Sequence, residues 1–310
     1  MHNAAEVAAL ATLNAHSMLE LEFDPELRTL FSWMKPTPRP CFSATLLEEI
    51  RQSETMLEST QGHINHRGKA FRVENVVYGS RVPGVFNLGG DLGMFVQAIL
   101  RQDRAQLSYY ARLCVENQLR RHRGFESGIS TIALIQGKAL GGGFECALAC
   151  HTIVAERSAT MALPETLFNL FPGMGALSFL GRRIGLRKAE ELITSGATFS
   201  AKDLCEMGVV DEVVEDGLGE AAVRRMIVHR QKRLNTYRSL VSARVEYQPV
   251  TLEELTKIVD IWVDGALRLD ARDLKMMGRL VRAQDKLVSL SPEEQAIEAL
   301  YANPAAAHAA

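Results

Sequence analysis

Short apolar runs alternate with longer amphipathic stretches through the first two thirds of the chain. Residues 19–23 alternate apolar and acidic side chains, as in a half-buried strand, and residues 30–34 supply an antiparallel partner across a turn at 24–26. Ser43 has the side chain and the position of an N-cap for a helix through about Glu58. We therefore expect a strand hairpin followed by a helix.

Further apolar runs predict buried strands at 71–79, 83–88, 131–137 and 151–156. Two helices fill residues 91–123, and one helix over about 142–150 separates the last two strands. Strands joined in this way by a helix run parallel in one sheet. The repeated alternation predicts a mostly parallel α/β core.

From Gly217 onward the apolar spacing is close to 3.6 residues, which predicts helices over 219–237, 251–269 and 271–288. The pattern divides the chain into a flexible leader over 1–17, a core over 18–216, a helical region over 217–300 and a disordered tail over 301–310. The tail is assigned as disordered because it consists mainly of alanine.

Composition changes this picture little. The 310 residues carry 35 Lys and Arg against 37 Asp and Glu, so nothing favours a nucleic-acid binder. The five cysteines include no CxxC pair, which argues against a zinc ribbon or a disulfide framework. No basic segment with a long apolar run opens the chain, and no apolar stretch approaches about 18 residues. We expect a cytoplasmic protein with no signal peptide and no membrane span.

The residues with chemical meaning gather in 135–180. Gly141, Gly142 and Gly143 stand between a buried strand and a helix. Glycine there lets the backbone approach a ligand and leaves N–H groups free at a helix N-terminus. Those donors and the helix dipole suit a developing oxyanion. A plain strand-to-helix turn explains the same residues equally well.

A second junction of strand, glycine pair and helix lies at LGGD, residues 88–91. Two junctions direct two N–H groups at one carbonyl oxygen, or each serves only as a turn. Glu145 falls in the first turn of the helix after the glycines, where burial would raise the pKa of its carboxyl. Glu165 follows Pro164 in a loop. Taken singly, these glutamates are also explained as a helix-dipole partner and a loop residue.

These segments resemble the crotonase superfamily of enoyl-CoA hydratases and isomerases. LGGD is similar to the first oxyanion motif of that family and ALGGGFE to the second. LPETLFNLFPGMGA is similar to the stretch that carries the second glutamate, and SFLGRRIGLRKAEELITSG, FSA and GVVDEVV resemble the downstream signature. The similarity runs in order from about residue 70 to residue 215.

The resemblance implies an α/β spiral of repeated ββα units with a C-terminal helical region that forms trimers or hexamers. It implies an oxyanion hole at Leu88, Gly89 and Gly142, and catalytic carboxyls at Glu145 and Glu165. Two carboxyls suit addition or elimination of water, because one takes the α-proton while the other protonates the leaving hydroxyl.

Within the superfamily the chain is similar to synthases of diffusible signal factors, which are cis-2-unsaturated fatty acids. The likeness is carried by LFSWMKPTPRPCFSATLLEEI, YGSRVPGVFNLGGDL, LPETLFNLFPGMGA and KIVDIWVDGALRL. It implies that a 3-hydroxyacyl chain on acyl carrier protein is dehydrated to the 2-enoyl thioester, which is then hydrolysed to the free acid. It implies no cofactor beyond the acyl carrier protein or coenzyme A that carries the thioester.

A long acyl chain requires an apolar tunnel, and its candidate wall residues are Leu140, Met174, Trp262 and Leu280. Each of them also suits plain core packing, and Trp262 resembles an aromatic pocket residue of the family. The basic stretches 120–123 and 223–233 are explained as solvated helix faces, or as a dock for acidic acyl carrier protein or coenzyme A phosphates. A sensor-kinase receiver domain is a partner of some family members.

Two other functions remain open. An enoyl-CoA hydratase or isomerase of fatty acid oxidation needs the same glutamates, but its GADI-like segment differs from the LGGD of this chain. A catalytically silent binding protein is disfavoured by the presence of both glutamates and both glycine junctions. The sequence contains no HExxH motif, P-loop or dinucleotide fingerprint, so we expect neither a metal nor a nucleotide cofactor.

Overall fold

A computed structural model describes residues 16–289, with side chains through Asp285. Most of the predicted leader, the predicted helical residues 290–300 and the predicted tail lie outside the described residues. Ser17, which the sequence places in the leader, is fixed to the fold. Its N–H and its hydroxyl donate to the Glu49 carboxylate at 2.8 and 2.9 Å.

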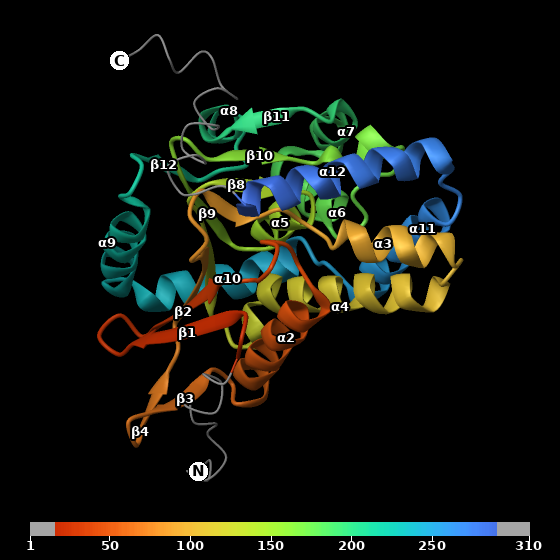
Figure 1. The fold of residues 1–310 in the computed structure, drawn as a ribbon. Helices are drawn as coiled ribbons and strands as arrows, with labels where there is room; N and C mark the ends of the chain where they lie inside the picture. The colour runs from red at the N-terminus through yellow and green to blue at the C-terminus, as the bar shows by residue number, and fades with distance from the viewer. Residues whose placement is uncertain (1–15, 290–310) are drawn as a thin grey trace.

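The larger sheet has six strands in the order β1-β2-β5-β7-β9-β12 (Figure 1). β1 runs antiparallel to β2, which confirms the predicted hairpin, and the other neighbours are parallel. The strands are β1 (Leu19–Asp24), β2 (Thr29–Met34), β5 (Asn75–Ser80), β7 (Ser130–Ile135), β9 (Thr152–Glu156) and β12 (Glu212–Val214).

The smaller sheet has the order β11-β10-β8-β6, with β11 antiparallel to β10 and the other pairs parallel. Its strands are β11 (Thr198–Ser200), β10 (Thr160–Ala162), β8 (Lys138–Leu140) and β6 (Val85–Asn87). The consecutive pairs β5/β6, β7/β8 and β9/β10 each contribute one strand to each sheet. The helices that follow are α3 (Leu92–Leu100), α5 (Gly142–Leu148) and α6 (Ala176–Ile184). This is the predicted spiral of ββα units.

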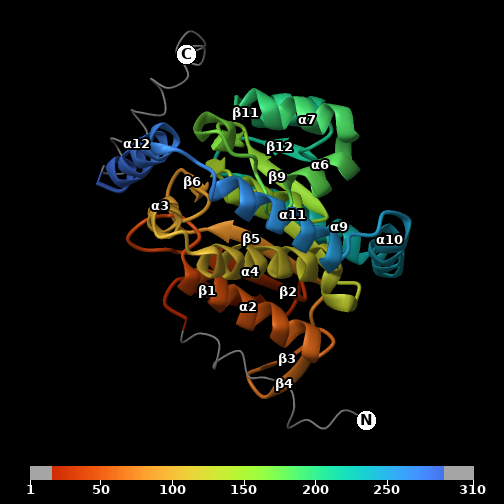
Figure 2. The same ribbon diagram turned by 90° about the vertical axis from the view of Figure 1, so that its right-hand side faces the viewer.

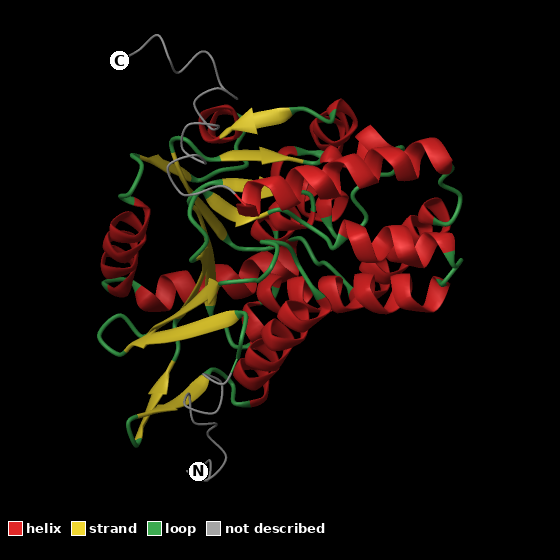
Figure 3. Ribbon diagram, viewed as in Figure 1, coloured by secondary structure: helices red, strands yellow, loops and turns green. Residues whose placement is uncertain are grey.

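Helices cover both faces of the larger sheet (Figures 2 and 3). α2 (Ala44–Ser59) and α4 (Arg104–His122) pack together on one side, and α9 (Gly219–Gln231) lies against β7 and β9 on the other. The Ser43 hydroxyl accepts the Leu46 N–H at 3.2 Å, so the predicted cap of α2 is confirmed. The smaller helices α7 (Leu186–Ser195) and α8 (Ala201–Glu206) follow α6.

The helical region packs back on the core. α11 (Leu252–Ala266) lies on α4, while α12 (Ala271–Ser289) lies on α3 and on the 3₁₀ turn η2 (Pro164–Phe168). Within the described part of the chain, no helix is long and apolar enough to cross a membrane.

Two predicted elements are wrong in their bounds. The strand expected over 71–79 is interrupted, because β4 (Lys69–Arg72) turns back to pair with β3 (His63–His66) before β5 begins. The helix expected over 219–237 ends at Gln231, and α10 (Leu234–Tyr247) starts in a new direction after Arg233, whose φ of −137° is not helical. Neither break contains the Gly or Pro that would have marked it in the sequence.

A second core cluster lies between the larger sheet and α9. It consists of Phe31, Trp33, Val77, Ile132, Leu134, Val154, Val223 and Ile227. Trp33 lies opposite Gly79 in the parallel register of β2 and β5, and its ring occupies the space that a Gly79 side chain would fill. The indole N–H donates to Glu22 at 3.0 Å. The packing of the Trp33 ring therefore requires glycine at position 79.

We expect Gly79→Ala to lower the free energy of unfolding by about 1–3 kcal/mol, because the new methyl group overlaps the Trp33 ring. Gly181→Ala is the matched control: it lies inside α6 with open space around its Cβ, so it should be neutral or stabilising by up to about 1 kcal/mol. Urea unfolding of both variants measures the difference. Equal effects would contradict this account of the Trp33 packing.

Candidate active site

The first glycine junction is almost fully hydrogen-bonded. The Leu88 N–H donates to the Pro40 carbonyl at 2.7 Å, and the Gly89 N–H donates to Asn87 Oδ1 at 2.8 Å. The Gly89 carbonyl accepts the Phe42 N–H at 2.7 Å. Among the described residues, the Gly90 N–H has no acceptor. It is therefore the one donor that this junction, residues 88–90, leaves for a ligand.

The second junction leaves one donor in the same way. The Gly141 N–H donates to the Ala162 carbonyl at 2.8 Å, and the Gly141 carbonyl accepts the Glu145 N–H at 2.9 Å. Gly142 is the first residue of α5, so its N–H has no acceptor within the helix. An added Cβ on Gly142 would lie 3.5 Å from the Gly90 nitrogen. The two free donors are neighbours.

The prediction for the first of the two oxyanion donors is therefore wrong, and the prediction of Gly142 as the second stays. Leu88 and Gly89 cannot supply donors, because Pro40 and Asn87 already accept their N–H groups. Gly90 takes their place beside Gly142. The sequence does not reveal this, because the acceptor at Pro40 is distant along the chain.

Glycine is required where the junctions meet. Gly89 has φ of +94°, and a Cβ there would lie 2.7 Å from the Leu140 carbonyl oxygen and 3.2 Å from the Gly142 nitrogen. A Cβ on Gly141, where φ is +48°, would lie 2.5 Å from Glu165 Oε1. The close approach of the two junctions therefore excludes a side chain at Gly89, and the Glu165 carboxyl excludes one at Gly141.

Glu145 is 2% exposed and lies on α5, one turn after Gly142. Its Oε1 accepts the N–H groups of Met174 and Ala176 at 2.9 and 3.1 Å. Burial raises the pKa of Glu145 to about 7, although the two backbone donors oppose the rise. The loop after η2 thus fixes one oxygen and leaves the other for chemistry.

Glu165 lies in η2, and its carboxyl group meets Gly141. Its Oε2 is buried and has no hydrogen-bond partner among the described residues. Burial and the nearby Glu145 charge raise the pKa of Glu165 to about 8. The two carboxyls therefore interact, and their protons are released as a coupled pair whose pKa values burial raises toward neutral pH.

A small cavity of about 20 Å³ lies beside the two free donors, between α2 and α4. Its lining residues are Phe42, Leu47, Ile50, Gly90, Tyr110, Cys114, Asn117, Gln118, Arg121, Gly142, Cys146 and Met174. Of the predicted tunnel residues, only Met174 is among them. Trp262 does not line the cavity. It packs on Gly173, and its ring meets the Phe95 ring edge-on with 5.3 Å between the ring centroids.

Leu140 and Leu280 do not line this cavity. Both are half-buried, and Leu280 packs against the main core cluster from α12. Five of the cavity residues that sequence reasoning missed lie on α4, at positions 110, 114, 117, 118 and 121. Their helical spacing was the available signal, but polar residues at such spacing usually indicate a solvated face.

The basic stretch 120–123 is not a solvated face. Arg121 is 2% exposed inside the core, Arg120 pairs with Glu58, and Arg123 donates to the Val250 carbonyl. In 223–233, Arg224 pairs with Asp24 and Glu220. Arg121 is therefore unavailable to a carrier protein, while Arg120 and Arg123 remain partly exposed.

The chain is similar to known proteins in both sequence and fold. Residues 35–257 match the sequence profile described as enoyl-CoA hydratase/isomerase. The chain is 36% identical to human mitochondrial methylglutaconyl-CoA hydratase over 168 residues, which are 50% of this chain and 44% of that protein. The structure of Pseudomonas aeruginosa DspI is similar, with TM-score 0.63 and 27% identity, covering 79% of this chain and 95% of that one.

The fold is also similar to that of an enoyl-CoA hydratase from Bacillus halodurans, with TM-score 0.68 and 20% identity, covering 85% of this chain and all of that one. The chain belongs to the enoyl-CoA hydratase/isomerase family, within the crotonase superfamily. The chain spans less than half the length of the human and rat methylglutaconyl-CoA hydratases, at 44% and 48%. Family membership therefore leaves the activity and the substrate of this chain open.

Raised carboxyl pKa values have a consequence for stability. The folded state binds the protons of Glu145 and Glu165 more tightly than the unfolded chain, so their contribution to the free energy of unfolding falls as pH rises from about 4.5 through about 8. We expect Glu165→Gln to match the wild type near the lower value and to exceed its Tm by roughly 5 °C at about pH 9. Calorimetry across this range measures the gap.

Glu190→Gln is the control, because Glu190 is exposed on α7. Its Tm difference from the wild type should stay small and independent of pH. If the Tm difference of Glu165→Gln were equally independent of pH, burial of the two carboxyls would not lower the free energy of unfolding at high pH.

Proposed function

We propose that the chain adds or removes water across C2 and C3 of an acyl thioester. The observation that carries the proposal is the buried pair of Glu145 and Glu165, with raised pKa values, beside the free N–H groups of Gly90 and Gly142. The two donors would hold the thioester carbonyl and stabilise the enolate that forms when the α-proton leaves. One carboxyl would take that proton and the other would protonate the leaving hydroxyl.

The pair of carboxyls suits this chemistry because burial raises the pKa of both groups toward neutral pH. A base and an acid are then present together, and each changes role when the reaction runs in reverse. Glu145 keeps a fixed orientation through the N–H groups of Met174 and Ala176. The position of that oxygen is thus set before substrate binds.

For the substrate, we propose a 3-hydroxyacyl chain on acyl carrier protein, with the cis-2-enoic acid released as a diffusible signal. Release would use the same donors, because water attack on the thioester also forms an oxyanion at the carbonyl. Support for this finer reading is the resemblance of the LGGD, LPETLFNLFPGMGA and KIVDIWVDGALRL segments to signal-factor synthases. Assembly as a trimer or hexamer and a sensor-kinase receiver domain as partner belong to the same proposal.

A second candidate is an enoyl-CoA hydratase that acts on coenzyme A thioesters. The match to human methylglutaconyl-CoA hydratase favours it, and it requires the same two glutamates. Retention of both carboxyls and both free donors argues against a third function, a catalytically silent binding protein.

We expect Glu145→Ala and Glu165→Ala each to lower kcat/KM by ~10²–10⁴, because each removes one proton-transfer group. Circular dichroism should show that both variants stay folded. Glu190→Ala, an exposed change on α7, should keep wild-type turnover. Wild-type turnover in both site variants would rule out this mechanism.

Parallel incubation with 3-hydroxyacyl carrier protein and with crotonyl-CoA separates the two substrate classes. We expect mass spectrometry to detect a free cis-2-enoic acid from the carrier-protein thioester, because the donors serve both dehydration and hydrolysis. Rapid hydration of crotonyl-CoA with no free acid from either substrate would replace the synthase with the hydratase.

A further inference from the structure

The cavity beyond the oxyanion donors is not uniformly apolar. Its lining includes Gly90 and Gly142 and, on α4, residues from Tyr110 to Arg121, which span about 16 Å along the helix axis. Apolar side chains from Phe42, Leu47, Ile50 and Met174 line it as well. The second half of the α4 wall, however, consists of polar residues, with Cys146 of α5 beside them.

Gln118 is the clearest member of this polar wall. It is 4% exposed, and its Oε1 has no hydrogen-bond partner among the described residues. The amide lies against the turn that holds Glu145, since a Cβ on Gly175 would be 2.6 Å from that oxygen. A buried acceptor without a partner is destabilising unless a ligand or water pairs with it.

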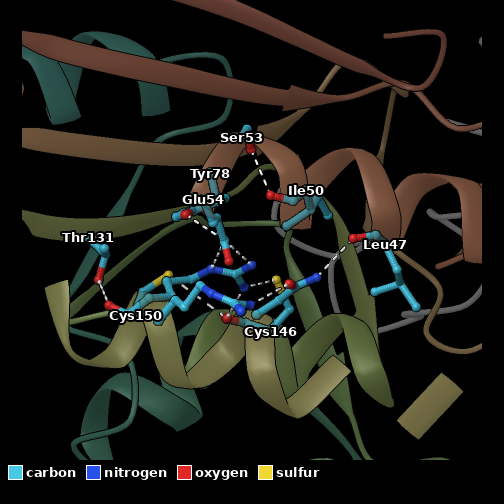
Figure 4. A network of polar contacts seen from close by, with 11 residues as sticks. Leu47, Ile50, Ser53, Glu54, Tyr78, Thr131, Cys146 and Cys150 are labelled. Carbon is cyan, nitrogen blue, oxygen red and sulfur yellow. Dashed lines mark hydrogen bonds and ion pairs between the residues drawn. The ribbon is translucent and has the colours of Figure 1, made fainter. Parts of the chain in front are cut away.

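Arg121 lines the inner part of the same wall, and its charge is already balanced. Glu54 accepts from its Nε and Nη2 at 3.1 and 2.7 Å, and Tyr78 donates to the same carboxylate oxygen at 2.8 Å. Nη1 contacts the Cys146 carbonyl oxygen at 3.3 Å and its sulfur at 2.7 Å (Figure 4). These bonds use four of the five guanidinium N–H groups.

This balance decides the charge of the group that fits. A second carboxylate would gain little from an arginine that Glu54 already neutralises, and it would lose its own hydration. A hydroxyl can donate to Gln118 Oε1 and can accept a hydrogen bond from a neighbouring donor, at a smaller cost of desolvation. A bare hydrocarbon leaves the Gln118 oxygen unpaired.

We propose that the inner wall of this cavity, formed by Gln118 and Arg121, binds a hydroxyl group carried on the acyl chain beyond C3. The inference rests on the proposed function, because it takes the cavity as the acyl site, and it adds a second polar substituent to the substrate. Gln118 is then a specificity-determining residue that selects hydroxylated chains over plain ones.

Calorimetry with pantetheine thioesters tests this without requiring turnover. The probes are the hexanoyl, octanoyl and decanoyl thioesters, their ω-hydroxy counterparts and their ω-carboxy counterparts. We expect one ω-hydroxy member to bind the wild type roughly ten- to hundredfold more tightly than its plain counterpart, and more tightly than its carboxylate. Gln118→Met should remove that preference.

Gln106→Met is the matched control, because Gln106 lies on α4 outside the cavity and should keep the preference. Equal binding of plain and hydroxylated chains by the wild type, tightest binding of a carboxylate, or an unchanged preference in Gln118→Met would each overturn the proposal. A preference for the hydroxyl with no dehydration of any 3-hydroxyacyl thioester would uphold this site and reject the proposed function. The wild-type comparison stands even if Gln118→Met does not fold.

Discussion

The parallel pairing of β6 with β8 is the contact on which the site depends. It places Asn87 opposite Ala139, so the turns that leave the two strands lie side by side. At this contact Gly89 has no room for a side chain, because an added Cβ would lie 2.7 Å from the Leu140 carbonyl oxygen. The same crowding that demands glycine also brings the two unpaired N–H groups together, so the packing constraint and the candidate oxyanion hole have one cause.

Around this contact the structure buries two carboxyl groups. Glu145 accepts hydrogen bonds from the N–H groups of Met174 and Ala176, at the end of the loop after η2, and Glu165 lies against Gly141 with one oxygen unpaired. Burial of carboxyls opposes folding and at the same time shifts their pKa values into the range useful for proton transfer. The C-terminal helices support the arrangement from behind, because Trp262 of α11 packs on Gly173 in that loop.

The polar inner wall likewise contains charged side chains in a buried position. Arg121 and Glu54 form a fully buried pair where apolar residues of similar volume would pack at least as well. A buried, hydrogen-bonded ion pair of this kind adds little net stability, but it fixes the positions of the side chains around it. In this chain Arg121 lines the small cavity next to the free donors of Gly90 and Gly142.

The sequence by itself determined the hairpin, the Ser43 cap, the β7–α5–β9 unit and the two glycine junctions, because each depends on local periodicity or on residues adjacent in the chain. It also selected Glu145 and Glu165 as candidates, through the resemblance of their segments to family motifs. It could not show that 71–79 contains a reversal, that Leu88 is already bonded to Pro40, or that Arg121 faces inward. Whether an N–H group is free, and whether a polar helix face meets water or a partner such as Glu54, is decided by residues distant in sequence. Only the tertiary structure brings those residues together. It shows that the free N–H group belongs to Gly90 instead of Leu88 or Gly89, and that α4 residues line the cavity.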